Sequence, residues 1–173
     1  MPDTLELLLK FSEDLGLESP RTEDALWEYL VRKGAGLLCC HAASFFEADE
    51  TKRTLTFKKS LGPVGGDLVG LSFGYQGIVG SCAETRKGIL INDTETSPFF
   101  TKKVDKGSGF KTKNVIAVPV LANGALLGVV EFINSMDGAF TEEQFKSAPL
   151  LAALIGRDVC IRRLEAAARP LTA

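Results

Sequence analysis

An Asn-Gly pair between two apolar runs is the feature of this sequence that most restricts its fold. Asn123-Gly124 separates the run at 115–121 from the run at 126–133. A type I′ turn needs positive φ at both central residues, and Asn-Gly meets this requirement. The sequence therefore predicts a tight hairpin whose two strands lie at the centre of an antiparallel sheet.

Four other segments have the character of strands. Residues 37–46 are almost continuously apolar, which is typical of a strand covered on both faces. Residues 54–58 alternate strictly between polar and apolar side chains, so we expect them to form a hairpin with the first segment. Shorter strands are predicted at 68–73 and at 89–91.

Helical periodicity predicts amphipathic helices at both ends of the chain. The first covers about residues 4–15, and its apolar stripe is expected to contain Leu5, Leu8, Leu9 and Leu15. The last covers about residues 142–166 and opens with the capping-box pattern of Thr141 and Gln144; Pro149 is expected to kink it.

Three helices are predicted between these two. One covers about residues 20–33 and ends at Gly34, a second covers 77–84, and a small one covers 99–106. The element order predicts an α+β fold in which helices pack on one face of a central antiparallel sheet. A ligand pocket formed by loops and the small helix is expected on the other face.

The length and composition suit one globular domain. We expect residues 1–173 to form a single domain, with its core at about 20–140. A net charge of -2, from 20 basic and 22 acidic residues, gives no positive field for nucleic acid. Neither a signal-peptide pattern nor an apolar run long enough to cross a bilayer is present, so no membrane association and a cytoplasmic location are expected.

The cysteines and the histidine give little sign of catalysis. Cys39, Cys40, Cys82 and Cys160 contain no C-x-x-C spacing, and we expect reduced thiols that are mostly core residues. His41 is the only histidine, which excludes sites built from several histidines. We therefore expect no metal, no cofactor and no catalytic residues.

Five short motifs follow one another along the predicted elements. These are Gly77-Ile78-Val79-Gly80, Val104-Asp105, Gly109-Phe110-Lys111-Thr112, Val118-Pro119-Val120 and Gly128-Val129-Val130-Glu131. Over roughly residues 5–165 the chain resembles the GAF domain family, most closely the regulatory GAF domains of cyclic-nucleotide phosphodiesterases. The resemblance implies a sensory domain in signal transduction that binds a small molecule, cyclic nucleotide among the candidates, and acts on an effector domain or subunit.

The same resemblance implies a set of ligand-binding residues. They are Ser44, Phe57, Lys58, Ile78, Val79, Asp105, Ser108, Thr112 and Glu131. Lys58 stands where those relatives have aspartate. Ser135 and Gln144 stand where they have a lysine and an aspartate that pair behind the pocket, and the joint loss leaves no unpaired buried charge.

Glu131 is the residue of this set whose chemistry is clearest from the sequence. It shares a face with Val129 and Ile133 in an apolar strand, where an unpaired carboxylate is costly. It is therefore expected to meet Lys58 or Lys102, to lie exposed at a sheet edge, or to accept a hydrogen bond from the exocyclic amine of a purine.

Two other functions remain open at this stage. One is a GAF enzyme like free methionine-(R)-sulfoxide reductase, for which only Cys82, near a helix start, could be activated. The other is a dimerisation scaffold with a vestigial pocket. We expect a homodimer through residues 4–15 and 145–165, because these two helices have more apolar residues than one stripe against the sheet would use. The surplus residues are Leu7, Leu151, Leu154 and Ile161.

Overall fold

The computed structural model describes residues 3–63, 66–98 and 110–168. Its helices are α1 (Thr4–Glu18), α2 (Glu23–Leu37), α3 (Gly77–Thr85) and α5 (Glu142–Ala168), with a 3-10 turn, η1, at Gly66–Leu68. Its strands are β1 (Cys40–Asp49), β2 (Thr54–Leu61), β3 (Ser72–Gly74), β4 (Ile89–Ile91), β5 (Val115–Ala122) and β6 (Ala125–Ser135). They form one antiparallel sheet in the order β3-β2-β1-β6-β5-β4.

The predicted central hairpin is confirmed. Strands β5 and β6 are joined by Asn123 and Gly124, whose φ values are 50° and 79°. Strand β6 also pairs with β1 along most of its length, so β1 and β6 are the two middle strands. The Asn123-Gly124 turn therefore determines the β5–β6 hairpin, and the remaining strands extend the sheet on either side of it.

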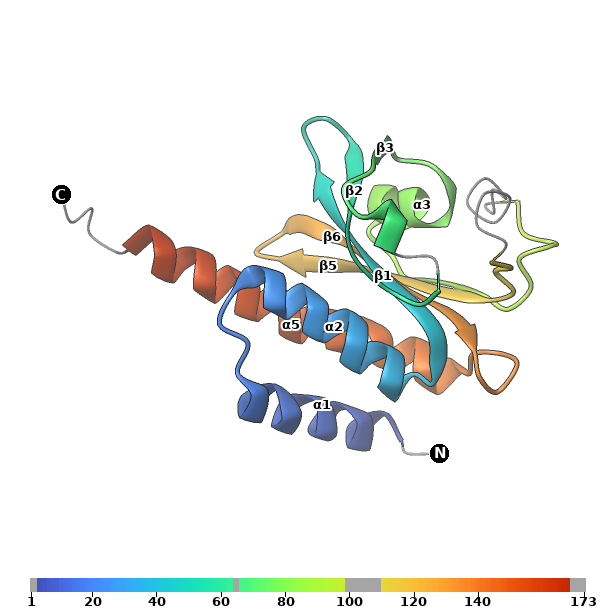
Figure 1. Ribbon diagram of the computed structural model, residues 1–173, viewed down its shortest axis with the longest axis horizontal. Coiled ribbons are helices and arrows are strands. Elements are labelled where there is room, and N and C mark those ends of the chain that lie inside the picture. The colour runs from blue at the N-terminus through green and yellow to red at the C-terminus, as the bar shows by residue number, and fades with distance from the viewer. Residues whose placement is uncertain (1–2, 64–65, 99–109, 169–173) are drawn as a thin grey trace.

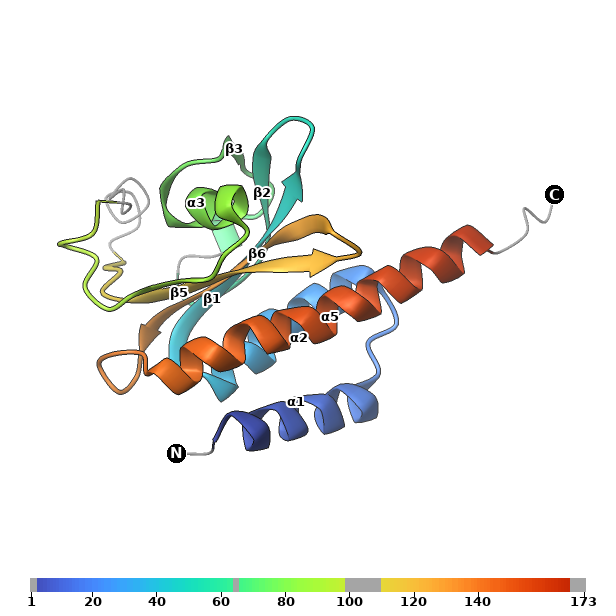
Figure 2. The same ribbon diagram turned by 180° about the vertical axis from the view of Figure 1, so that it is seen from behind.

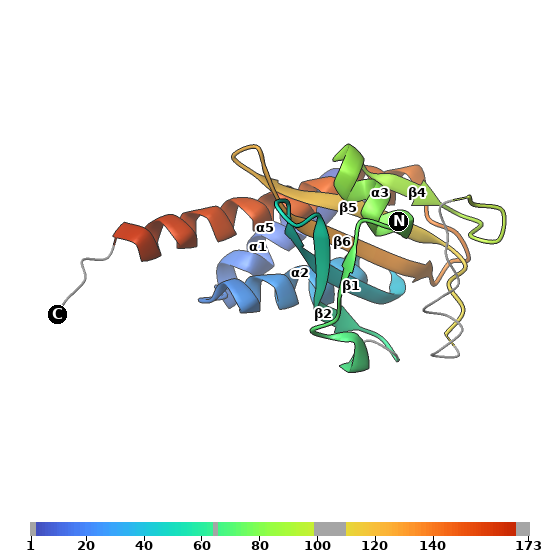
Figure 3. The same cartoon turned by 90° about the horizontal axis from the view of Figure 1, so that it is seen from above.

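Helices cover the two faces of the sheet unequally. Helices α2 and α5 lie against one face and α1 lies outside them, in a third layer (Figures 1 and 2). Helix α3 lies on the opposite side (Figure 3). We call the first side the helical face and the second the pocket face. The expected α+β arrangement is therefore correct.

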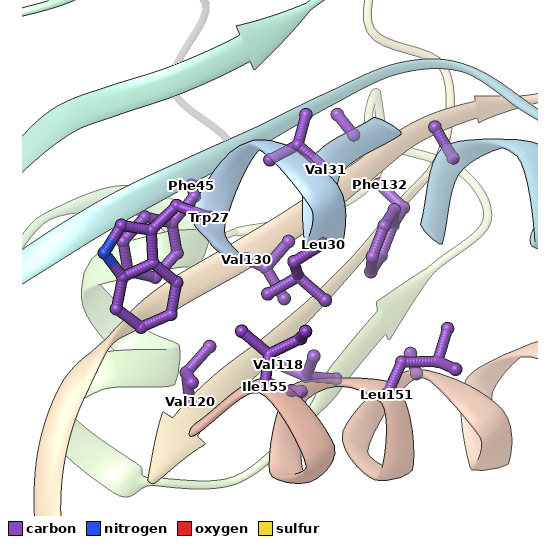
Figure 4. Packing of buried hydrophobic residues seen from close by; sticks show 14 of the residues in the cluster. Trp27, Leu30, Val31, Phe45, Val118, Val120, Val130, Phe132, Leu151 and Ile155 are labelled. Carbon is purple, nitrogen blue, oxygen red and sulfur yellow. The ribbon is translucent and has the colours of Figure 1, made fainter. Parts of the chain in front are cut away.

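The helical face contains the larger apolar core. In Figure 4, Val118, Val130 and Phe132 of the sheet meet Leu30 of α2 and Ile155 of α5. All of these side chains are fully buried. At one end of this core the rings of Trp27 and Phe45 stack, with centroids 4.0 Å apart and an interplanar angle of 14°. Burial on this scale makes the helical face the main source of stability.

The end of α2 differs from the prediction. The helix continues through Gly34 to Leu37, and β1 begins at Cys40 rather than at residue 37. A Cβ atom on Gly34 would lie 2.6 Å from Cε1 of Phe132. Gly34 is therefore required because α2 approaches β6 closely, and it does not end the helix.

The buried side of α1 agrees with the prediction in part, since Leu8 and Leu15 of the predicted stripe pack against the core. Leu5 and Leu9 are exposed, whereas Leu7 and Phe11 are 5% and 0% exposed. The expectation that Leu7 and Leu151 would be surplus residues at a dimer surface is therefore wrong, since Leu151 is also fully buried. Helix α1 packs on other helices rather than on the sheet, and their positions select its buried side.

The remaining boundaries follow the predictions in part. Strand β3 is shorter than the predicted 68–73, and β4 has the predicted bounds. Helix α5 is one helix through Pro149, and its capping box is present. In that box the N–H of Thr141 donates to Oε1 of Gln144, and the N–H of Gln144 donates to Oγ1 of Thr141. The helix predicted at 99–106 lies outside the described residues.

None of the described helices is both long enough and apolar enough to cross a membrane.

Candidate functional site

Two polar side chains lie opposite each other at the centre of the pocket face. Ser44 of β1 is the direct partner of Glu131 of β6, and Ala117 of β5 is the partner of Glu131 on its other side. Partners in an antiparallel pair point to the same face, so Ser44 and Glu131 form one polar spot. Ser44 is 5% exposed and Glu131 is half-buried.

The surroundings of this polar spot are apolar and aromatic. Phe46 contacts Phe57 and Phe73 edge to face, with ring centroids 4.2 Å and 5.8 Å away. Ile78 and Val79 of α3 complete the same buried cluster. The predicted residues Ser44, Phe57, Ile78, Val79 and Glu131 therefore gather on one face, around a carboxylate.

Close packing of the chain before α3 holds this helix over the sheet. A Cβ atom on Gly80 would lie 2.5 Å from the carbonyl carbon of Tyr75. Glycine therefore lets the first turn of α3 fold back against the segment that precedes it. That position brings Cys82, which is 0% exposed, towards β6.

The thiol of Cys82 is unsuited to nucleophilic chemistry. Burial, and to a smaller extent the nearby Glu131 carboxylate, raises its pKa to about 12. A reactive cysteine needs a lowered pKa, which a cationic neighbour or an exposed helix start provides. Cys82 is instead a protonated core residue at neutral pH. Cys40 is similar, since burial also raises its pKa to about 12.

Lys58 lies apart from the polar spot. Phe45 pairs with Lys59 and Phe46 pairs with Phe57, so Lys58 is the extra residue of a β-bulge. Its Nζ atom lies 2.9 Å from the carboxylate of Glu47. The side chain of Lys58 is therefore engaged by Glu47 and does not join the residues around Glu131.

The other predicted residues lie near the start of β5 or outside the described residues. Thr112 is 9% exposed, and its carbonyl accepts a hydrogen bond of 2.6 Å from Oγ1 of Thr94. Asp105, Ser108 and Lys102 are among the residues that the structure does not describe.

An asparagine network that joins the start of β5 to the end of β6 was missed by the sequence analysis. Asn134, at φ 58°, accepts from the N–H of Lys113 and donates to the carbonyl of Lys111. Asn114 accepts from the N–H of Ser135, and Asn92 makes two bonds to the main chain of Phe140. Of these three asparagines only Asn134 has the left-handed backbone that asparagine tolerates, and this conformation cannot be seen in the sequence.

The two positions that hold an ion pair in the phosphodiesterase-type pattern carry neutral groups with partners of their own. Oγ of Ser135 accepts from the N–H of Asp137 at 3.3 Å. Nε2 of Gln144 donates to the carbonyl of Leu38 at 2.8 Å. Both neutral side chains therefore have hydrogen-bond partners, one within the local turn and one that links α5 to the residue after α2.

A separate hollow of about 640 Å³ lies beside the β1–β2 hairpin. Its acidic residues are already paired, Glu47 with Lys58, Asp49 with Lys52 and Glu50 with Arg86. Within residues 3–63, 66–98 and 110–168, no group of three or more His, Cys, Asp or Glu side chains could hold a metal ion. The polar spot on the pocket face is therefore the better candidate site.

Two phosphodiesterases are similar in sequence to part of this chain. A probable 3',5'-cyclic phosphodiesterase, pde-5 of Caenorhabditis elegans, is 32% identical over 81 residues, 47% of this chain and 11% of that protein. The cone cGMP-specific phosphodiesterase subunit alpha' of Mus musculus is 35% identical over 60 residues, 35% of this chain and 7% of that protein. The chain thus corresponds to a small part of each of these proteins.

Solved structures share the fold over nearly the whole chain. The GAF domain of a phosphoenolpyruvate-protein phosphotransferase from Coxiella burnetii has a TM-score of 0.81 at 18% identity, covering 95% of this chain and 97% of that one. The free methionine-R-sulfoxide reductase of Neisseria meningitidis has a TM-score of 0.75 at 14% identity, covering 94% and 91%. At such identities the likeness shows the fold alone. The sequence itself matches the GAF domain over residues 20–157. This chain therefore belongs to the GAF domain family.

Proposed function

We propose that this domain senses a small organic molecule on its pocket face and regulates an effector domain or subunit. The observation that supports this most directly is the pair Ser44 and Glu131, a polar spot within an aromatic and aliphatic wall. Ligand sites are mostly apolar surfaces with a few polar groups that fix the orientation of the ligand. Among the described residues, the centre of the helical face is filled by Phe45, Val118, Val130 and Phe132, which favours the pocket face as the place for binding.

We propose a purine nucleotide, cyclic by preference, as the ligand. The partial likeness to proteins named as cyclic phosphodiesterases supports this class. The carboxylate of Glu131 would accept a hydrogen bond from the exocyclic amine, Thr112 would lie at the edge of the base, and Phe57 would contact its face. A buried polar group that is left without its hydrogen-bond partner costs about 1–3 kcal/mol, so these residues would determine the affinity for the ligand.

Calorimetry with cyclic AMP and cyclic GMP tests this ligand class. We expect a dissociation constant in the micromolar range or tighter, weakened about ten- to a hundredfold in Glu131→Ala and Thr112→Ala. Glu84→Ala is the matched control, because Glu84 is an exposed carboxylate of α3 that pairs with Arg53. No heat with either nucleotide at millimolar concentration would remove this ligand class.

We also propose that the domain acts by binding and not by catalysis. The raised pKa of the Cys82 thiol supports this, since a reductase of the methionine-sulfoxide type attacks with a thiolate. An assay with free methionine sulfoxide and thioredoxin should show no turnover above the level without protein. Turnover that disappears in Cys82→Ala would establish the enzyme instead.

We further propose that residues 1–173 form one domain, located in the cytoplasm, that works as a homodimer through α1 and α5. Leu7 and Leu151 are inside the core and cannot contribute, whereas Leu5 and Leu9 on α1 are 65% and 53% exposed. Light scattering at tens of micromolar should give twice the monomer mass. A monomer would leave the pocket-face proposal untouched and remove the dimer.

A further inference from the structure

The β5–β6 turn, residues 122–126, is bonded to a helix on each face of the sheet. On one side it accepts a hydrogen bond from Arg86, the residue that follows the end of α3. On the other side it donates a hydrogen bond to Cys160 of α5. Helices α3 and α5 lie on opposite faces of the sheet (Figure 3), so this turn links the pocket face to the helical face.

Arg86 and Glu50 hold the β5–β6 turn from the pocket side. Nη1 of Arg86 donates to the carbonyl of Gly124 at 2.6 Å, and the guanidinium also pairs with the carboxylate of Glu50. The second oxygen of that carboxylate accepts from the N–H of Leu126 at 3.1 Å. Hydrogen bonds to charged groups are stronger than neutral ones. One ion pair therefore grips main-chain groups on both sides of Ala125.

These side chains bind the turn where the sheet no longer does. The pairing of β1 with β6 ends at Glu47 and Gly128, and Leu126 lies two residues beyond that point. The N–H of Leu126 is bonded there by the side chain of Glu50. This hydrogen bond, and to a smaller extent Arg86, holds the pKa of the Glu50 carboxyl below its ordinary value. The carboxylate is therefore charged at neutral pH, as the grip on the turn requires.

The other side of the hairpin end packs closely on α5. Nδ2 of Asn123 donates to Sγ of Cys160 at 3.0 Å. One helical turn earlier, a Cβ atom on the buried Gly156 would lie 2.7 Å from the carbonyl oxygen of Leu121. Residues four positions apart lie on the same side of a helix, so both contacts fall on one side of α5. Figure 2 shows the end of the hairpin next to this helix. A displacement of the turn would therefore act on residues 156–160.

We propose that the β5–β6 turn transmits the position of α3 to residues 156–160 of α5, with Arg86 and Glu50 as positioning residues. Coupling between distant sites is carried by contiguous packed and hydrogen-bonded groups, and the contacts above form such a chain from one face to the other. This deepens the proposed function and rests on it, since α3 matters to a ligand only as a wall of the pocket face. A ligand that moves α3 would then act on α5.

Thiol labelling measures how firmly α3 is held, and it needs no ligand. Cys82 of α3 and Cys40 in the core of the helical face are both buried. Faster labelling of Cys82 alone reports local movement of α3, whereas equally faster labelling of both thiols reports unfolding of the whole domain. The exposed Cys39 is replaced by glycine, which suits its φ of 49°. Peptide mass spectrometry then reads each remaining thiol separately.

Removing either positioning side chain should loosen α3. Arg86→Ala and Glu50→Ala should each raise the labelling rate of Cys82 about tenfold and leave that of Cys40 unchanged, because each removes charge-assisted hydrogen bonds to the turn. An unchanged rate at Cys82 would overturn the proposal. An equal rise at Cys40 would also overturn it, since the two side chains would then stabilise the whole fold.

Glu84→Ala is the matched control for these variants. Glu84 also joins α3 to the β1–β2 turn, through an exposed ion pair with Arg53. Exposed ion pairs contribute little, so the labelling rate of Cys82 should change by less than about twofold. A rise in the control as large as in Arg86→Ala would overturn the special role of Arg86 and Glu50.

Hydrogen exchange along α5 tests the transmission itself. Arg86→Ala should speed amide exchange several-fold in residues 156–162 and leave residues 148–152 unchanged. Asn123→Gly, which keeps the left-handed backbone accessible, should have the same effect by breaking the contact with Cys160. In the double variant the contribution of Arg86→Ala should be largely lost, because both substitutions interrupt one path. Additive effects, or no change in residues 156–162, would overturn the path through this turn.

These measurements are separate from the nucleotide titration. Loosened α3 and faster exchange in α5, together with no binding of either nucleotide, would support the transmission and remove only the ligand class. Nucleotide binding together with unchanged labelling and exchange would overturn the transmission and leave the binding proposal standing.

Discussion

The two faces of the sheet are built differently although adjacent residues supply them. On β1, Phe45 points to the helical face and stacks on Trp27, whereas Phe46 points to the pocket face and meets Phe57. Of the described helices, α1, α2 and α5 lie on the first side in two layers, and only the short α3 lies on the second. Only the second side places a carboxylate, Glu131, in the middle of its apolar surface.

This difference indicates how stability and function are divided. The dense apolar packing of the helical face can maintain the fold, so the pocket face can contain polar groups that lower its packing quality. Substitutions on the pocket face should then affect binding more than folding. Three measurements test whether the division is real.

The largest expected effect concerns the two neighbouring phenylalanines. Phe45→Ala should lower the free energy of unfolding by about 3–5 kcal/mol, because it opens a cavity beside Trp27 in a closed core. Phe46→Ala should cost about 3 kcal/mol or less, since the neighbouring Phe73 is only partly buried and can repack. Chemical denaturation measures both, with Phe45→Leu and Phe46→Leu as milder controls. Equal losses would contradict the proposed division.

A smaller effect is expected at the end of β6, where Asn134 holds the segment before β5. Asn134→Ala should cost about 2–3 kcal/mol, because it leaves the N–H of Lys113 and the carbonyl of Lys111 without this partner. Asn134→Gly removes the same bonds but keeps the left-handed backbone accessible, so it should cost about 1 kcal/mol less. Hydrogen exchange should show faster exchange in residues 110–114 and little change in α2. Equal deprotection of α2 would mean that the two faces unfold together.

The smallest effect concerns one thiol on each face. Burial raises the pKa of Cys40 and Cys82 from 9.0 to about 12. The thiols of the unfolded chain therefore lose their protons at a lower pH than those of the folded protein. The stabilisation of the folded state by these pKa shifts is fully present below pH 9 and is lost as the pH rises towards 12. From pH 8 to pH 10 each thiol should account for a loss of about 1.4 kcal/mol.

Single replacements separate the two thiols. Cys40→Ala and Cys82→Ala should each make the fall in unfolding free energy between pH 8 and pH 10 shallower by that amount. An unchanged slope in Cys82→Ala alone would mean that water reaches the pocket face at α3, which would sharpen the contrast with the sealed helical face.

Several features of the fold could be predicted because their causes are local in the sequence. The Asn123-Gly124 turn and the Thr141–Gln144 capping box each depend on residues a few positions apart, and both are confirmed. The grouping of Ser44, Phe57 and Glu131 on one face came from a family resemblance combined with strand periodicity. Periodicity fixes which residues share a face, but it does not say what covers that face.

The errors came from contacts between distant segments. Gly34 looks like a helix end in the sequence, yet only the approach of α2 to Phe132 explains it. The buried side of α1 was predicted correctly for Leu8 and Leu15 and incorrectly for Leu5 and Leu9, because the neighbouring helices determine which leucines are buried.

The sequence by itself therefore determined the strand hairpins, the helix caps and the alternation of faces, since these depend on backbone preferences over a few residues. The tertiary structure decided the register around Lys58, the asparagine network and the direction of each amphipathic helix. It also decided which of the two faces was closed by helices and which kept Glu131 half-buried. These outcomes depend on packing between residues far apart in the chain, where hydrogen-bond partners and available volume exist only after the sheet has formed.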